Sequence, residues 1–238
     1  CIEIENNINI INNINSNINE IYKSSNIEFK FIPEENELNT FFDKVKQFGK
    51  IIIKNMNNNK LKLSSIIGND LNNIELIQNW IEETINKKEI KFELIFKMSE
   101  NGNKSDDFHK YCDNKGPTLT LIKTTKNKIF GGFTPLNWKN QGYQTKDDKN
   151  QTFIFSLNLK KKYNMLKKDG SAICCHKSEA ANFGLCDFYL KQNMKTGGSY
   201  ANKFCNFLSN NNLELTGGKG NDENFETEEL EVYQVIYY

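Results

Sequence analysis

The sequence of 238 residues contains no arginine, and lysine supplies every basic side chain. Arginine is the residue that binds phosphates and guanine edges through two parallel hydrogen bonds. The 31 basic and 30 acidic residues nearly balance, and the lysines are interleaved with acids instead of gathered in one stripe. Since nucleic-acid-binding proteins usually carry a basic stripe, we expect no nucleic-acid partner.

Long apolar runs are absent as well. No run approaches the roughly 20 residues with which a helix crosses a bilayer, so we expect no membrane insertion. The chain starts with Cys1-Ile2-Glu3, without the basic and apolar segments of a secretory signal. Its 6 cysteines include no C-x-x-C pair, and reduced thiols are their simplest interpretation. These features together predict a cytoplasmic protein.

Histidine is scarce, which limits metal binding. The chain has 2 histidines, His109 and His176, whereas a structural zinc site usually needs about four Cys or His ligands. We therefore expect no metal ion and no cofactor, and we expect His109 at the surface or at the edge of the core. The run Gly217-Gly218-Lys219-Gly220 lacks the spacing of a phosphate-binding loop, and we expect a surface loop there.

Residues 1–26 consist largely of isoleucine and asparagine. Isoleucines recur at heptad spacing from Ile4, a pattern typical of a coiled coil through which copies of the chain would form a homo-oligomer. A disordered asparagine-rich tract is the alternative, because asparagine is a poor helix former. We expect residues 27–60 to form a linker module with a short strand and a helix, and residues 61–238 to form the main domain.

Periodic patterns in residues 61–238 predict the elements of this domain. Isoleucines at helical spacing predict a helix over Ile74–Ile85. Alternation predicts strands at Phe92–Met98 (with Phe92, Leu94, Phe96 and Met98 on one face), Thr118–Thr124, Lys128–Thr134, Phe153–Leu159 and Leu230–Tyr238, and a hairpin turn at Thr125-Lys126-Asn127. Short antiparallel strands with flanking helices predict an α+β, mainly β fold: a two-sheet antiparallel β-sandwich with peripheral helices.

Three local features add detail to this fold. Ser105 is the expected N-cap of a further helix. The pair Gly131-Gly132 inside a strand indicates a β-bulge or close packing by another element. Asp113, which precedes Gly116-Pro117, is expected to anchor a turn by accepting hydrogen bonds from backbone N–H groups.

Several of these residues belong to a longer ordered set of motifs. In chain order the set contains Asp113, Gly116, Pro117, Gly131, Gly132, Trp138, Phe183 and Gly184. It resembles the TLDc domain of eukaryotic oxidation-resistance proteins. The resemblance implies two antiparallel sheets with peripheral helices, a role in resistance to oxidative damage, and binding to the vacuolar proton-pumping ATPase. It supplies no accepted catalytic constellation.

One group of residues could supply a nucleophile, a base and an orienting acid: Cys174, His176 and Asp187. Cys174 and His176 would lie on the same face of a strand. A reactive thiolate needs a lowered pKa, and no nearby cation in the sequence would supply it. Buried thiols that act as small apolar side chains are the alternative.

An acidic cluster near the C-terminus offers a second candidate site. Glu228, Glu229 and Glu231 are candidates for a protein-binding edge, since acidic surfaces select partners and speed association. A solvated face is the alternative. Our first hypothesis is therefore a non-enzymatic protein-binding module. The competing hypotheses are a thiol-dependent enzyme or peroxide sink that uses Cys174, Cys175 or Cys186, and a cargo domain of a coiled-coil scaffold protein.

Overall fold

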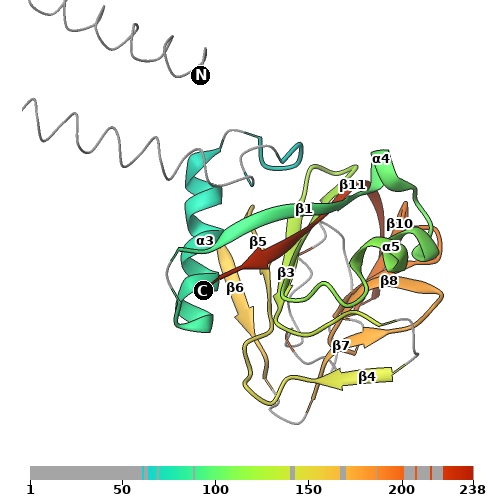
Figure 1. Ribbon diagram of the computed structural model, residues 1–238. Helices are drawn as coiled ribbons and strands as arrows, with labels where there is room; N and C mark the ends of the chain where they lie inside the picture. The colour runs from blue at the N-terminus through green and yellow to red at the C-terminus, as the bar shows by residue number, and fades with distance from the viewer. Residues whose placement is uncertain are drawn as a thin grey trace, which may run out of the picture. The chain divides into compact units, whose positions relative to one another are not determined.

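A computed structural model describes residues 61, 64–68, 70–87, 89–139, 143–166, 170–185, 187–200, 207, 215 and 222–237. The expected coiled-coil seam, the linker module and the loop at residues 217–220 lie outside these residues, as does Cys186. In chain order the described elements are α3 (Leu71–Ile85), β1 (Lys91–Lys97), α4 (Met98–Asn101), α5 (Ser105–Cys112), β2 (Thr118–Thr124), β3 (Ile129–Thr134), β4 (Tyr143–Lys146), β5 (Phe153–Ser156), β6 (Lys161–Asn164), β7 (Ser171–Cys175), β8 (Glu179–Phe183), β9 (Phe188–Lys191), β10 (Thr196–Tyr200) and β11 (Asp222–Ile236) (Figure 1).

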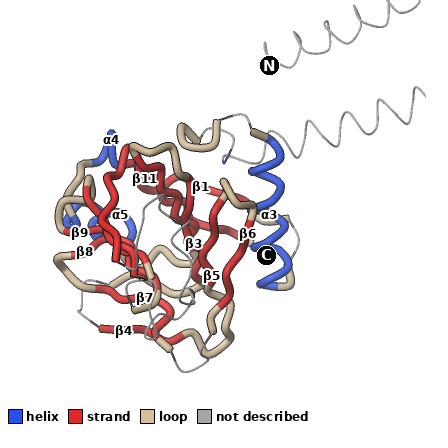
Figure 2. The backbone as a smooth tube through the Cα atoms, turned by 180° about the vertical axis from the view of Figure 1, so that it is seen from behind, coloured by secondary structure: helices blue, strands red, loops and turns tan. Residues whose placement is uncertain are grey.

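The strands form two antiparallel sheets that share the long strand β11 (Figure 2). The first sheet has the order β1-β11-β2-β3-β5-β6, and the second has the order β4-β7-β8-β9-β10-β11. The N-terminal part of β11 pairs with β10, whereas its C-terminal part lies between β1 and β2. The predicted two-sheet, mainly β fold is confirmed. The predicted terminal strand is part of a longer strand, which begins at Asp222.

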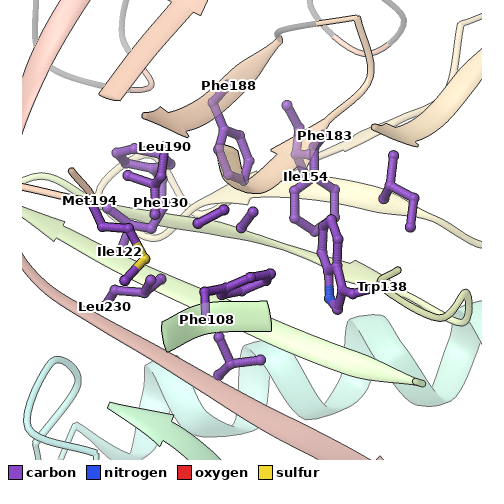
Figure 3. Close-up of a cluster of buried hydrophobic side chains, with 14 of the residues drawn as sticks. Phe108, Ile122, Phe130, Trp138, Ile154, Phe183, Phe188, Leu190, Met194 and Leu230 are labelled. Atoms are coloured by element: carbon purple, nitrogen blue, oxygen red, sulfur yellow. The ribbon is translucent and has the colours of Figure 1, made fainter. Parts of the chain in front are cut away.

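Two apolar cores lie on opposite faces of the first sheet. One core contains side chains from both sheets, including Ile122, Phe130, Phe183 and Phe188 (Figure 3). The other core joins the first sheet to α3 and includes Leu119, Leu121, Phe133, Phe153 and Phe155. The first sheet is therefore covered on both faces, which explains why β2 is buried along nearly its whole length.

The amphipathic helix α3 forms as its isoleucine spacing predicts. Ile74, Ile77, Ile81 and Ile85 are its buried residues. The carboxylate of Asp70 accepts hydrogen bonds from the N–H groups of residues 72 and 73 at the helix start, which satisfies donors that have no partner inside the helix. Burial of each isoleucine contributes about 1.5–3 kcal/mol of apolar transfer free energy.

A β-bulge in β1 changes which face its side chains occupy. The pairing with β11 shifts register between Leu94 and Phe96. As a result, Phe92 packs in the core beneath α3, whereas Phe96 packs between the two sheets. Leu94 is 38% exposed. The expectation that Phe92, Leu94, Phe96 and Met98 share one face is therefore wrong, because an extra residue shifts the alternation.

The paired glycines of β3 allow close packing and do not form a bulge. The pairing of β3 with β2 and β5 keeps its register through Gly131 and Gly132. A Cβ atom on Gly132 would lie 2.5 Å from Cε1 of Phe183, in the facing sheet. A Cβ atom on Gly131 would overlap the backbone oxygen of Thr120. The close-packing interpretation is correct and the bulge interpretation is wrong.

Candidate functional site

The motif residues around Trp138 form one structural unit. The indole Nε1 of Trp138 donates to Oγ1 of Thr118 over 2.9 Å, and the Trp138 ring lies 5.5 Å from the rings of Phe108 and Phe183. Figure 3 shows these rings converging between the sheets. The N–H of Asn114 donates to the Trp138 carbonyl. These contacts build the core and expose no reactive group.

The turn after α5 is held against the loop that contains Trp138. Asp113 forms an isolated parallel bridge with Trp138. The N–H of Gly116 donates to Oδ1 of Asn137, and a Cβ atom on Gly116 would overlap the backbone oxygen of Leu136. The carbonyl of Pro117 accepts from the N–H of residue 235 in β11. Asp113 and Gly116-Pro117 thus belong to a structural turn that connects α5, the loop containing Trp138, and β11.

The histidine of α5 is a buried connector. His109 is 5% exposed, and its Nδ1 lies 2.8 Å from Oδ1 of Asp113. Its Nε2 lies 3.0 Å from the carbonyl oxygen of Glu179, at the start of β8. The imidazole therefore joins α5 to the second sheet. The expected surface position is wrong, because the ring is buried where α5 meets the second sheet.

Ser105 is the first residue of α5 and not its N-cap. The N-cap position is occupied by Lys104, whose backbone N–H donates to the carboxylate of Asp107. The hydroxyl of Ser105 instead donates to the Lys177 carbonyl over 2.8 Å. The expected cap is therefore wrong by one residue, because the Ser105 hydroxyl finds a partner in the turn between β7 and β8.

The candidate triad of Cys174, His176 and Asp187 is spread over both ends of β8. Cys174 lies in β7, and His176 follows in the turn that leads into β8, where its Nδ1 is 2.6 Å from Oγ of Ser178. Asp187 lies beyond the other end of β8, and β8 spans Glu179–Phe183. Five strand residues extend roughly 16 Å, at about 3.3 Å per residue. Asp187 therefore does not orient His176.

Asp187 has a local structural role. It is fully buried, and its Oδ1 accepts from the N–H of Phe207 over 2.8 Å. Gly184 has φ of +70°, and a Cβ atom there would overlap Oδ2 of Asp187. Phe183-Gly184 and Asp187 thus form a tight turn between β8 and β9, in which only glycine leaves room for the carboxylate.

The described thiols are not prepared for nucleophilic chemistry. Burial raises the pKa of Cys112 well above its usual value, and the nearby Asp113 raises it further. Burial also raises the pKa of the Cys174 and Cys175 thiols, and the charge of Glu179 adds to the effect at Cys174. Because the thiolate is the nucleophile, each raised pKa lowers the reactive fraction near neutral pH.

The three candidate acids of β11, Glu228, Glu229 and Glu231, have three different environments. Glu228 is exposed, and its Oε1 lies 2.7 Å from Nζ of Lys123. Glu229 is half-buried and accepts from the N–H of Ser99 in α4. Glu231 is 1% exposed and therefore does not belong to the acidic surface. The expectation that all three form one binding edge is corrected at Glu231, while Glu228 and Glu229 stay at the surface.

Glu231 holds a turn that precedes α3. Its Oε2 accepts from Oγ of Ser64 and from the hydroxyl of Tyr233. Its Oε1 accepts from both the N–H and Oγ of Ser65, each over 2.8 Å. Burial raises the pKa of Tyr233, and the charge of Glu231 raises it further, so the phenol stays protonated and keeps donating. The buried carboxylate thus has four hydrogen bonds.

Sequence reasoning missed this buried site, although a signal was present. Leu230 and Val232 pack between the sheets, whereas Tyr233 and Val235 pack beneath α3. Alternation along the strand therefore assigns Glu231 to the face beneath α3, which is covered. The partners Ser64 and Ser65 are more than 160 residues away in sequence, and no local pattern links them to Glu231.

Two further properties of the described residues concern ligands and membranes. Among the residues that the structure describes, no group of three or more His, Cys, Asp or Glu side chains is placed to hold a metal ion. In the same part of the chain, no helix combines the length and the apolar character that crossing a membrane requires.

The chain belongs to the TLDc domain family, whose model matches residues 61–236. This match covers more than half of the chain and contains every motif residue described above. No curated protein is similar enough to the chain to count as a match. The family assignment therefore rests on the domain as a whole and not on a single relative.

Proposed function

We propose that this chain is a non-enzymatic protein-binding module that supports cellular resistance to oxidative damage. Membership in the TLDc domain family agrees with a role in oxidative-stress resistance. The proposed partners are subunits of the vacuolar proton-pumping ATPase, and the proposed location is the cytoplasm. A homo-oligomer formed through residues 1–26 also stays a prediction.

The observation that supports binding over catalysis is the state of the thiols. Cys112, Cys174 and Cys175 all have a raised pKa, mainly because Cys112 and Cys175 are buried and Cys174 is half-buried. The residues that would assist a nucleophile lie at opposite ends of β8. A thiol-dependent enzyme would instead require a lowered thiol pKa and a base within hydrogen-bond distance. The alternative of a peroxide sink uses Cys174, Cys175 or Cys186, and the raised pKa disfavours it at Cys174 and Cys175.

Charge reversal on the exposed acids of β11 tests the binding proposal. The test variant carries Glu228→Lys at the candidate edge together with Glu226→Lys at the neighbouring exposed acid of β11. We expect recovery of vacuolar-ATPase subunits with the purified chain to fall, because reversed charges at an interface slow association and repel the former partner. The control variant carries Glu75→Lys and Glu83→Lys on α3.

The two variants are matched in charge and in lost interactions. The test variant loses the Glu228–Lys123 ion pair, and the control loses the Glu83–Lys162 ion pair. Each exposed pair contributes at most about 1 kcal/mol, so both variants are expected to fold. Equal recovery of the ATPase subunits with the test variant and the wild type, at low and at moderate salt, would contradict the proposed binding edge.

A further inference from the structure

The turn before α3 is a small element with large apolar side chains. We call Ser64–Gly68 the anchor turn. The Oγ of Ser64 accepts from the N–H groups of Ile66 and Ile67, and the N–H of Gly68 donates to the Ser64 carbonyl. Ile66 and Ile67 are buried in the core beneath α3, together with Leu61. The anchor turn therefore holds the start of the domain in place.

A single carboxylate fastens the anchor turn to the first sheet. Glu231 of β11 accepts from Oγ of Ser64, and from the N–H and Oγ of Ser65. Hydrogen bonds to a charged acceptor are stronger than neutral ones. Because Glu231 is buried, its side chain cannot turn toward water without disturbing the core. The position of the anchor turn thus depends on the hydrogen bonds that Ser64 and Ser65 donate to the Glu231 carboxylate.

Ser65 differs from Ser64, the other serine that contacts Glu231, because Ser65 is an exposed residue whereas Ser64 is buried. Among the serines whose side chains the structure describes, Ser65 and Ser99 are exposed. The Ser65 hydroxyl lies 2.8 Å from Oε1 of Glu231. The hydroxyl of an exposed residue in contact with a buried carboxylate is a place where a new negative charge would have a large effect.

We propose that Ser65 is a phosphorylation site and that the phosphate releases the anchor turn from β11. In this step a protein kinase transfers the γ-phosphoryl group of a nucleoside triphosphate to Oγ of Ser65. The Oγ–H bond breaks and an Oγ–P bond forms, while the bond from the γ-phosphorus to the bridging oxygen breaks. The nucleoside diphosphate leaves, and the proton passes through the kinase's general base to solvent.

The phosphorylated chain cannot keep residue 65 in its present contact with Glu231. Phosphoserine carries about −1.5 to −2 charges near pH 7 and has lost the donor that faced Glu231. Phosphate and carboxylate oxygens would meet where one hydrogen bond now forms, in an interior where charges are weakly screened. The carboxylate is fixed by Tyr233 and by its strand. The anchor turn must therefore move, and Ile66 and Ile67 move with it.

The kinase acts on an opened form of the turn. A kinase needs an extended substrate, and segments near the start of a domain open locally at lower cost than central strands. Modification of the open form prevents closure, so the equilibrium shifts toward the open state. The phosphate thus converts a transient opening into a lasting one.

Phosphoserine placed directly in the chain of 238 residues tests the release. With phosphoserine at position 65, we expect amide hydrogen exchange of residues 64–68 to rise by about ten-fold or more, because hydrogen bonds to a charged group are lost. The matched control is phosphoserine at position 99. Ser99 also adjoins an acid, but Glu229 is only half-buried and can turn toward solvent. Exchange at residues 64–68 should not change in this control.

A double-variant cycle identifies the cause of the release. Glu231→Gln keeps the side-chain shape and an acceptor oxygen but removes the charge, so phosphoserine at position 65 should have a smaller effect in this background. An equal effect in the wild-type and Glu231→Gln backgrounds would overturn the proposed repulsion. Unchanged exchange with phosphoserine at position 65 would overturn the release itself.

Mass spectrometry of the chain recovered from cells that express it tests the modification. We expect a phosphate on Ser65 in a fraction of the chains, and its absence across growth and peroxide-stress conditions would overturn the assignment of Ser65 as a phosphorylation site. Phosphate at Ser99 but not at Ser65 would overturn it equally. The effect on exchange and the presence in cells are separate requirements, and the proposal needs both.

Discussion

Single residues in this domain are constrained mainly by the space and the hydrogen bonds around them. Gly132 lies under the ring of Phe183, and Gly184 lies against the carboxylate of Asp187. Trp138 needs Thr118 for its indole N–H. Gly132, Gly184 and Trp138 are motif residues within the TLDc match, and each has a packing reason for its identity. Motif residues of this kind therefore indicate the fold of the domain and not a catalytic activity.

Gly132→Val should destabilise the domain strongly. The added side chain would overlap the Phe183 ring, which is packed between the sheets and cannot move away freely. We expect the free energy of unfolding to fall by about 2–3 kcal/mol, a typical cost of overpacking. Lys126→Ala, in the exposed turn between β2 and β3, is the control. Urea unfolding measures both, and similar midpoints would contradict the packing described for Gly132.

Glu231→Ala should be among the most damaging changes on β11. It leaves the hydroxyls of Ser64 and Tyr233, both buried residues, without their acceptor, and Ser65 loses two hydrogen bonds as well. We expect a loss on the order of 3 kcal/mol in the free energy of unfolding, the cost of several unsatisfied polar groups. Glu226→Ala, at an exposed position of the same strand, should cost less than about 0.5 kcal/mol. Equal thermal stability of the two variants would contradict the buried site.

At the scale of elements, periodicity predicts what is locally encoded. The isoleucine stripe predicts α3, and the turn at residues 125–127 predicts the β2–β3 hairpin; both are confirmed. Alternation alone does not predict which face of the sheet each side chain of β1 occupies. One bulge moves Phe96 to the face opposite Phe92. Alternation also underestimates the length of β11, because Asp222–Glu226 has the composition of a charged loop although it pairs with β10.

Fragments test how the elements depend on one another. A fragment that starts at Leu61 is expected to fold alone, and one that starts at Thr118 is not. The shorter fragment lacks α3 and β1, so Leu119, Leu121 and Phe133 lose their cover, and each large side chain forfeits about 1.5–3 kcal/mol. Circular dichroism during urea titration measures this, and cooperative unfolding of the shorter fragment would place the boundary elsewhere. The boundary near Leu61 stays a prediction until then.

At the scale of the whole molecule, the order of motifs predicts the family and the fold, and both are confirmed. The candidate sites could not be predicted as well, because a site depends on contacts between distant segments. The acidic composition around Glu231 suggests a surface position, although Glu231 is buried and binds Ser64 and Ser65. Cys174, His176 and Asp187 resemble a constellation only because they are close in sequence.

The central claim is that the domain acts by binding and not through its thiols. The measurement that tests it most directly combines Cys174→Ala, Cys175→Ala and Cys186→Ala in one chain. Survival of cells under peroxide is measured together with recovery of vacuolar-ATPase subunits. Near-wild-type circular dichroism and a cooperative thermal transition must first show that the triple variant is folded, since Cys175 is buried.

We expect the folded triple variant to protect cells from peroxide as well as the wild type does and to recover the same ATPase subunits. The reason is that the thiols of Cys174 and Cys175 have a raised pKa and therefore little reactivity. Loss of protection in this folded variant, with recovery of the subunits unchanged, would contradict the claim and favour a thiol-dependent enzyme or peroxide sink.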